Sequence, residues 1–160
     1  MTIKVFYSFH YSQDVWRAGQ VRNIGALDGN KPVNDNEWED VKKGGDAAIK
    51  KWIDNNMASR SCVIVLIGEH AADRKWIRYE IESGWKNNKA LFGIYIHDLK
   101  DRFGNTSRRG LNPFDGNKFT FEGKAVDIKV YNPSPANAYD SIARNIENWT
   151  ETALKQIGKS

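Results

Sequence analysis

Six consecutive apolar residues, Cys62-Val-Ile-Val-Leu-Ile67, lie near the middle of this chain of 160 residues. The run is far shorter than the roughly 18 apolar residues of a membrane-spanning helix, and its Val and Ile residues favour a β-strand. A strand whose side chains are apolar on both faces has to be covered on both faces. The run therefore predicts a central strand of a parallel sheet that has helices on either side.

Other short apolar runs alternate with segments of helical period. Strands are expected at residues 3–9, 61–67 and 90–96. Apolar residues that recur every three or four positions predict helices at residues 14–23, 46–56 and 73–85. The C-terminal helix is the clearest, with Ser134 as its expected cap and Pro135 in its first turn. Its apolar stripe consists of Tyr139, Ile142, Ala143, Ile146, Trp149, Ala153 and Ile157.

This alternation predicts an α/β fold, namely a doubly wound, mostly parallel five-stranded sheet with helices on both faces. The remaining two strands are expected within residues 26–33 and 125–131. The length of the chain fits one domain, residues 1–160. The polar passage at residues 98–124 is longer than an ordinary connection, which is typical of functional or mobile loops.

Charge and cysteine content exclude several classes of protein. The 24 Lys and Arg residues exceed the 20 Asp and Glu residues by only four, and no basic stretch stands out, which argues against nucleic-acid binding. The single cysteine, Cys62, lies inside the apolar run, so a disulfide framework or cysteine metal site is not expected. Without a signal peptide or a membrane-length run, we expect a cytoplasmic protein with no membrane partner. The P-loop, G-x-G-x-x-G and G-x-S-x-G patterns are absent as well.

A ligand site is expected at the carboxyl ends of the parallel strands, because loops and helix N-termini converge there. All three histidines of the chain, His10, His70 and His97, follow predicted strands. Histidine is common in polar loops, so these positions have an ordinary structural explanation. A three-histidine metal site is the alternative, although no helical H-x-x-x-H pair supports it.

Glu80 is the charged residue with the most unusual predicted position. At about 100° per residue, it lies on the same helix face as the apolar residues Trp76, Ile77 and Ile81, whereas Arg78 lies on the opposite face. A carboxylate on a core-facing stripe is costly unless it is paired or lines a cavity. Either a buried partner such as an arginine or backbone amides satisfies Glu80, or its carboxylate faces a ligand pocket.

Two further residues are placed where such a pocket would lie. Trp76 precedes Glu80 by one turn on the same face, where it either packs in the core or forms a wall for a planar ring. Ser8 stands near the end of the first strand, where it is either a small residue in a tight place or a hydroxyl that faces the pocket.

The chain resembles a known family in four short motifs. Val5-Phe-Tyr-Ser-Phe-His-Tyr11 is similar to the first-strand motif of TIR domains, which have a flavodoxin-like fold, and Trp76-Ile-Arg-Tyr-Glu-Ile81 is similar to their W-x-x-x-E helix. Together with Trp38-Glu-Asp40 and Asn112-Pro-Phe-Asp115, these motifs resemble the TIR-like ThsB proteins of bacterial Thoeris anti-phage defence. They span residues 5–115, which is most of the chain.

The resemblance implies an enzyme that breaks the nicotinamide–ribose bond of NAD, with NAD as substrate and without a further cofactor or metal. It implies that Glu80 is the catalytic carboxylate and that Ser8, Phe9, His10 and Trp76 bind the substrate. Several NAD-cleaving TIR domains carry basic residues where this chain has His10 and Tyr11. This departure leaves the residues that contact the pyrophosphate unidentified.

The resemblance also implies a partner. The expected product is a cyclic or otherwise modified ADP-ribose that activates a separate effector, ThsA, and TIR domains also associate with one another. From its length alone, the passage at residues 98–124 is a candidate lid that excludes water from the site. The rival interpretation is a non-catalytic TIR-like or flavodoxin-like module that signals by protein contact, with Glu80 as a paired structural residue.

Overall fold

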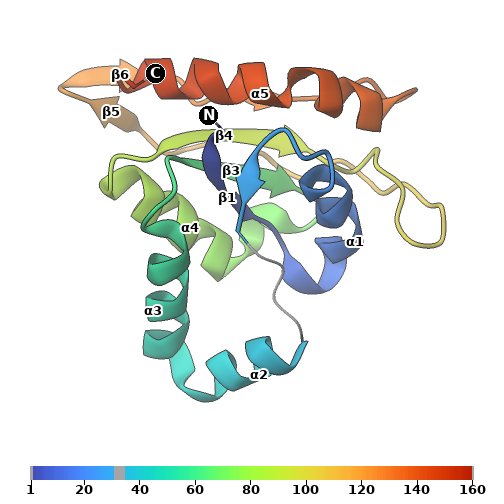
Figure 1. Ribbon diagram of the computed structural model, residues 1–160, viewed down its shortest axis with the longest axis horizontal. Helices are drawn as coiled ribbons and strands as arrows, with labels where there is room; N and C mark the ends of the chain where they lie inside the picture. The colour runs from blue at the N-terminus through green and yellow to red at the C-terminus, as the bar shows by residue number, and fades with distance from the viewer. Residues whose placement is uncertain (1, 31–34, 160) are drawn as a thin grey trace.

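The computed structural model describes residues 2–30 and 35–159, and its centre is a parallel sheet (Figure 1). The strands have the order β2-β1-β3-β4-β7, and all four neighbouring pairs are parallel. This confirms the predicted doubly wound α/β class. The strands are β1 (Lys4–Ser8), β2 (Asp28–Gly29), β3 (Cys62–Ile67), β4 (Ala90–Tyr95) and β7 (Val130–Tyr131).

Helices cover both faces of this sheet. Helices α1 (Tyr11–Arg22) and α5 (Ala138–Gln156) pack on one face, and α3 (Gly45–Met57) and α4 (Lys75–Lys86) pack on the other. The side chains of β3 alternate between these two layers, and every one of its six residues is buried. The apolar run thus forms the central strand that its composition predicts. In the described part of the chain, no helix has the length and apolar character that crossing a membrane requires.

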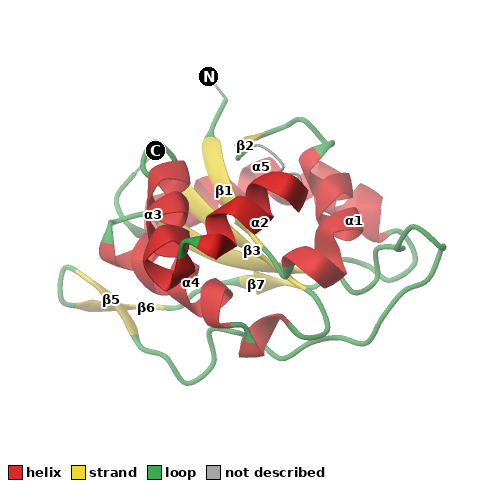
Figure 2. Ribbon diagram, turned by 90° about the horizontal axis from the view of Figure 1, so that it is seen from below, coloured by secondary structure: helices red, strands yellow, loops and turns green. Residues whose placement is uncertain are grey.

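Helix α2 (Asp35–Lys43) was not predicted from the apolar periodicity. It lies beside α3 on the same side of the sheet, in front of the strands in the view of Figure 2. Its Trp38 ring packs edge-on against Trp52 of α3, with ring centroids 5.7 Å apart. A helix of nine residues is marginal by itself, so this aromatic contact is a main attachment of α2 to the rest of the fold.

The two short strands differ from their predicted extents. Only Asp28–Gly29 of the expected strand at residues 26–33 pairs with β1, and residues 31–33 lie outside the described residues. The expected strand at residues 125–131 is divided. Its start belongs to β6 (Lys124–Val126), which forms an antiparallel hairpin with β5 (Phe119–Phe121), and only β7 joins the central sheet. The prediction of one continuous strand was wrong because the chain changes its pairing partner within it.

Several helix ends also differ from the predicted positions. Helix α1 begins at Tyr11 because the His10 side chain accepts a hydrogen bond from the Gln13 amide and so caps the helix. The predicted cap of the C-terminal helix at Ser134 was wrong: α5 begins at Ala138, and the Ser134 carbonyl instead closes a turn with the Asn137 amide. A short 3₁₀ turn, Ala71–Asp73, precedes α4, which therefore begins at Lys75.

Candidate active site

A cleft of about 750 Å³ lies at the carboxyl end of β1. At this point the order of the strands in the sheet changes direction, because β2 lies on one side of β1 and β3 lies on the other. Binding sites for small molecules span roughly 300–1,000 Å³, and a reversal of strand order is their usual place in such sheets. Side chains from β1, α1, α2, α3 and α4 line the cleft. The lining residues include Phe9, His10, Tyr11, Arg22, Trp38, Lys42, Trp52, Lys75, Trp76 and Glu80.

Glu80 lies in the middle of α4 and faces this cleft. The residue is 8% exposed, and Ser8 Oγ donates a hydrogen bond of 2.6 Å to its Oε1 atom. Among residues 2–30 and 35–159, no Lys, Arg or His forms an ion pair with this carboxyl group. Burial raises the pKa of Glu80 to about 8, and the Ser8 hydrogen bond opposes that rise. Of the two sequence alternatives, the structure therefore shows the carboxyl group at a pocket.

Ser8 acts on the cleft indirectly. It is the last residue of β1, is 1% exposed, and is not among the residues that line the cleft. Its hydroxyl group reaches Glu80 across the gap between β1 and α4. Ser8 thus fixes the orientation of the carboxyl group, and the expectation that its hydroxyl faces the ligand space is not met.

Phe9 and Trp76 both line the cleft, and their binding of the substrate stays a prediction of the resemblance. The half-buried Trp76 ring packs edge-on against Tyr79 at a centroid distance of 5.9 Å, and the Lys75 ammonium group lies 4.9 Å from its centroid. Trp76 therefore presents a fixed aromatic surface one helical turn from Glu80. A planar ring in the cleft would find a stacking surface there.

His10 is the only one of the three histidines that lines the cleft. Its Nδ1 atom accepts a hydrogen bond of 3.1 Å from the Gln13 amide, so the proton of the neutral ring is on Nε2. Burial, together with the nearby positive charge of Arg74, lowers the pKa of His10. The imidazole is therefore a neutral hydrogen-bond donor at the wall of the cleft.

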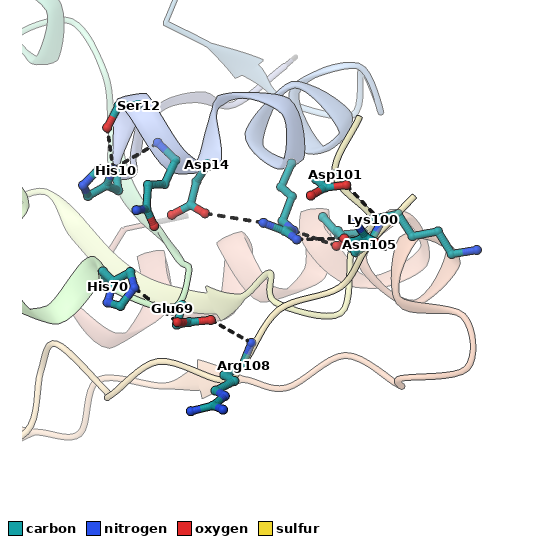
Figure 3. Close-up of polar contacts among 12 residues, drawn as sticks. His10, Ser12, Asp14, Glu69, His70, Lys100, Asp101, Asn105 and Arg108 are labelled. Atoms are coloured by element: carbon teal, nitrogen blue, oxygen red, sulfur yellow. Dashed lines mark hydrogen bonds and ion pairs between the residues drawn. The ribbon is translucent and has the colours of Figure 1, made fainter. Parts of the chain in front are cut away.

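The other two histidines do not line the cleft, although Figure 3 shows His70 and His10 within one group of polar residues. His70 contacts Glu69 at 3.2 Å, and the other Glu69 carboxylate oxygen accepts a hydrogen bond from the Arg108 amide. His97 is 9% exposed and contacts Asp98 at 3.2 Å. The three histidines do not form a metal site, because the described residues contain no group of three or more His, Cys, Asp or Glu side chains placed to hold a metal ion.

Residues 98–124 do not cover the cleft. Every residue that lines the cleft falls between Phe6 and Glu80. The Gly110 backbone packs so tightly against Gly68 that an added Cβ atom would lie 2.1 Å from the Gly68 carbonyl oxygen. The proposed lid position was therefore wrong, because this passage is fixed beside the ends of β3 and β4. The Asn112 motif within it is structural: its side chain accepts a hydrogen bond from the amide of the buried Phe114.

Residue-level reasoning from the sequence missed the outer wall of the cleft. The rings of Phe9, Tyr11, Trp38 and Trp52 follow one another at centroid distances of 6.4, 6.2 and 5.7 Å. They come from three separate segments of the chain, so no periodicity within one helix reveals them. The motifs that contain Phe9, Tyr11 and Trp38, noted for their resemblance to TIR domains and ThsB proteins, pointed to part of this wall, whereas Trp52 was not expected there.

Comparison with known proteins identifies the family of this chain. Residues 6–101 match the family model described as "Thoeris protein ThsB, TIR-like domain". A Bacillus cereus (strain MSX-D12) protein named "Putative cyclic ADP-D-ribose synthase ThsB1" is 34% identical over 151 residues, which cover 89% of this chain and 78% of that protein. The matched family range includes both Ser8 and Glu80. The chain therefore belongs to the TIR-like ThsB family of Thoeris proteins.

Proposed function

We propose that this protein cleaves the nicotinamide–ribose bond of NAD and converts the remainder into a cyclic or modified ADP-ribose. The observation that carries the proposal is Glu80, a buried carboxyl group that faces a cleft of about 750 Å³ and has a serine hydroxyl, not a cation, as its partner. The name of the Bacillus cereus relative supports the same reaction class.

The chemistry explains why one carboxylate is sufficient. Nicotinamide in NAD already carries a positive charge and leaves with the bonding electron pair as a neutral ring, so it needs no proton from an acid. Ordinary glycosidases use a second carboxyl group for that proton. The carboxylate of Glu80 binds the ribose hydroxyl groups and stabilises the positive charge that develops on the sugar as the bond breaks.

The raised pKa of Glu80 fits this role. With a pKa of about 8, the carboxyl group is mostly protonated at pH 7 in the empty cleft. A cationic nicotinamide ring beside it favours the charged form, so substrate binding promotes loss of the proton. Trp76 offers the ring a stacking surface one turn away, and the neutral His10 offers a hydrogen-bond donor.

The rival interpretation, a non-catalytic module with a structural Glu80, finds less support. A structural buried carboxylate is normally compensated by a cation or by several hydrogen-bond donors. The described residues supply Glu80 with one hydroxyl group and no ion pair. Desolvation without compensation is typical of a group positioned for a ligand.

The biological setting follows from the family. We propose that the product is a signal made in the cytoplasm of an infected cell, where it activates a separate effector, ThsA. In this scheme NAD is the substrate and the chain needs no other cofactor. Self-association through TIR–TIR contacts, and infection as the trigger, remain predictions of the resemblance.

The test compares Glu80→Gln with Glu82→Gln, an exposed position two residues away on the same helix. Cells that carry wild type or either variant are sampled with and without phage, and nicotinamide and ADP-ribose species are measured by mass spectrometry. We expect wild type and Glu82→Gln to accumulate the products and Glu80→Gln to lose them. Equal product levels in infected cells with wild type and Glu80→Gln would contradict the proposal.

A further inference from the structure

Arg22, the last residue of α1, places its guanidinium group in the wall of the cleft. The group lies over the Phe9 ring, 5.1 Å from the ring centroid. The residue is half-buried, and its Nε atom is fully buried without a hydrogen-bond partner. Arg22 is therefore a partly desolvated cation that faces a ligand-sized space.

The surroundings of Arg22 do not neutralise it. Among the described side chains, which exclude those of residues 31–36, no Asp or Glu oxygen lies within 4.0 Å of its guanidinium group. Burial lowers the pKa of Arg22, and a second cation, Arg60, lowers it as well, whereas the Tyr7 and Tyr11 side chains oppose this change. An unpaired, partly buried cation is costly for the folded state, so its position calls for an anion from outside the chain.

Three other basic side chains, Lys42, Arg74 and Lys75, line the cleft; Arg74 is exposed, and the two lysines are already paired. Lys42 lies 2.8 Å from Glu39, and Lys75 forms an ion pair with Asp46. Both are exposed, so their charges are also screened by water. Arg22 differs from them in combining burial, a position in the cleft and the absence of a carboxylate partner.

The cleft has a buried carboxyl group on the α4 side of β1 and a partly buried guanidinium group on the α1 side. Ser8 at the end of β1 bonds to Glu80 of α4, whereas the next residue, Phe9, packs toward α1 and supports Arg22. A ligand that crosses the end of β1 meets a carboxyl group on one side and a guanidinium group on the other. NAD has this order of charges, since its cationic nicotinamide riboside is joined directly to a pyrophosphate.

We propose that Arg22 is the phosphate-binding residue of the cleft and holds the pyrophosphate of a nucleotide ligand. That the nucleotide is NAD rests on the function proposed above, whereas the anion site itself does not. The planar guanidinium group can donate two hydrogen bonds to phosphate oxygens, and a buried arginine is better suited to this than an exposed lysine. Arg22 supplies the phosphate contact for which positions 10 and 11 of this chain offer no Lys or Arg.

The test uses the purified full chain and titration calorimetry with two probes, ADP and adenosine. The variants are Arg22→Met, which keeps an unbranched apolar stem over Phe9, and Arg22→Lys, which keeps the charge. Arg144→Met on α5, exposed and outside the cleft, is the matched control. Hydrogen bonds to charged groups contribute about 10-fold to 100-fold in affinity.

We expect wild type and Arg144→Met to bind ADP at least 10-fold more tightly than adenosine. Arg22→Met should bind both probes with similar affinity, and Arg22→Lys should keep part of the preference for ADP. Denaturant unfolding should show Arg22→Met to be as stable as wild type or more stable, because an unpaired charge is removed. Unchanged ADP affinity in Arg22→Met, or a wild type without preference for ADP, would overturn the proposal.

The same titrations separate this inference from the proposed function. ADP binding is measured without turnover, and Glu82→Gln, the exposed control outside the cleft, should bind ADP like wild type. If ADP binding depends on Arg22 while nicotinamide release does not depend on Glu80, the phosphate site stands and the enzymatic proposal falls. If release depends on Glu80 but ADP binding does not depend on Arg22, the phosphate site falls alone.

Discussion

Glu80 and Ser8 form one unit to which a helix and a strand each contribute a side chain. The carboxyl group is buried on α4, and its only hydrogen-bond donor among the described residues is the hydroxyl group at the end of β1. Burial and the hydrogen bond act on the pKa of Glu80 in opposite directions. The protonation state of Glu80 therefore depends on how well β1 and α4 are aligned.

The variant Ser8→Ala tests this dependence. Loss of the hydrogen bond removes the contact that favours the charged form of Glu80, so the pKa of Glu80 should rise further above its wild-type value of about 8. A hydrogen bond to a charged group contributes about 1.5–3 kcal/mol, which corresponds to about 1–2 pH units. The pH profile of nicotinamide release should move to higher pH by that amount, with little change in KM. An unshifted profile would show that Ser8 does not set the ionisation of Glu80.

Glu80 should also make the stability of the protein depend on pH. Its pKa is about 8 in the folded state and near 4.5 when exposed, so the folded state holds an extra proton between these values. The free energy of unfolding of wild type should then fall as the pH rises from about 5 to 8. At about 1.4 kcal/mol per pH unit, the loss over this interval is at most about 4 kcal/mol.

Glu80→Gln removes this titrating group, so its advantage over wild type should increase with pH over that interval. Urea unfolding at pH 5, 6.5 and 8 measures the difference, and Glu82→Gln serves as the exposed control on the same helix. A stability difference between Glu80→Gln and wild type that stays constant with pH is the result that would contradict the raised pKa.

At the scale of the element, the packing of α4 on β3 depends on Gly84. A Cβ atom at this position would lie 2.7 Å from Val63 Cγ2, which is too close for a stiff, fully buried side chain to accommodate. In α1, by contrast, a Cβ atom at Gly19 would have no neighbour within 4 Å. The two helices thus contain one glycine that the packing requires and one that it does not.

The pair Gly84→Ala and Gly19→Ala separates packing from helix propensity. Alanine in place of glycine stabilises a helix by about 1 kcal/mol, whereas overpacking a core costs about 1–3 kcal/mol. We expect Gly84→Ala to lower the free energy of unfolding by about 1–2 kcal/mol and Gly19→Ala to raise it by about 0.5–1 kcal/mol. Chemical denaturation of both variants measures the two signs, and a stabilised Gly84→Ala would show that α4 can move away from β3.

The elements that the sequence predicts well are those whose own side chains carry the signal. The apolar stripe of α4 placed Glu80 at the core face, and the uniform run of β3 predicted a strand covered on both sides. Helix α2 is too short and polar for such a stripe, since its only apolar residues are Trp38 and Val41. β7 is only two residues long, and its pairing with β4 depends on the folded sheet and not on a pattern in its own sequence.

The same distinction applies to the candidate site. Glu80 and Trp76 were predictable because they share one helix face. Arg22 was not, because its importance arises from the lack of a carboxylate partner within the folded cleft. The outer aromatic wall was equally hidden, since Tyr11, Trp38 and Trp52 come from three helices and meet only after folding.

At the scale of the whole molecule, Arg17 joins α1 to the passage that follows β4. Its Nε atom donates a hydrogen bond of 2.7 Å to the Leu99 carbonyl, and its Nη2 atom donates one of 2.8 Å to the Asn105 carbonyl. Its Nη1 atom lies 3.9 Å from a carboxylate oxygen of Asp14. Arg17 and Asp14 are both buried, at 6% and 3% exposure. This connection fixes residues 98–110 beside α1 rather than over the cleft.

Arg17→Met should therefore destabilise the whole fold in a manner that depends on pH. Burial raises the pKa of Asp14 to about 6, and Arg17 opposes that rise. Without Arg17 the pKa of Asp14 rises further. Above that new pKa the Asp14 carboxylate is charged, buried and unpaired, which lowers the free energy of unfolding by about 3–5 kcal/mol. At pH 5 the carboxyl group is neutral, and the loss should fall to the cost of the broken hydrogen bonds, about 1–3 kcal/mol.

Urea unfolding of Arg17→Met at pH 5 and pH 8 measures this difference, with Arg144→Met as the control on α5. The double variant Asp14→Asn/Arg17→Met removes the carboxylate as well, so it should lose the pH-dependent part of the destabilisation and keep the rest. If Arg17→Met were equally destabilised at both pH values, Arg17 would act through its backbone contacts alone. The charge of Asp14 would then have no part in holding α1 against the passage after β4.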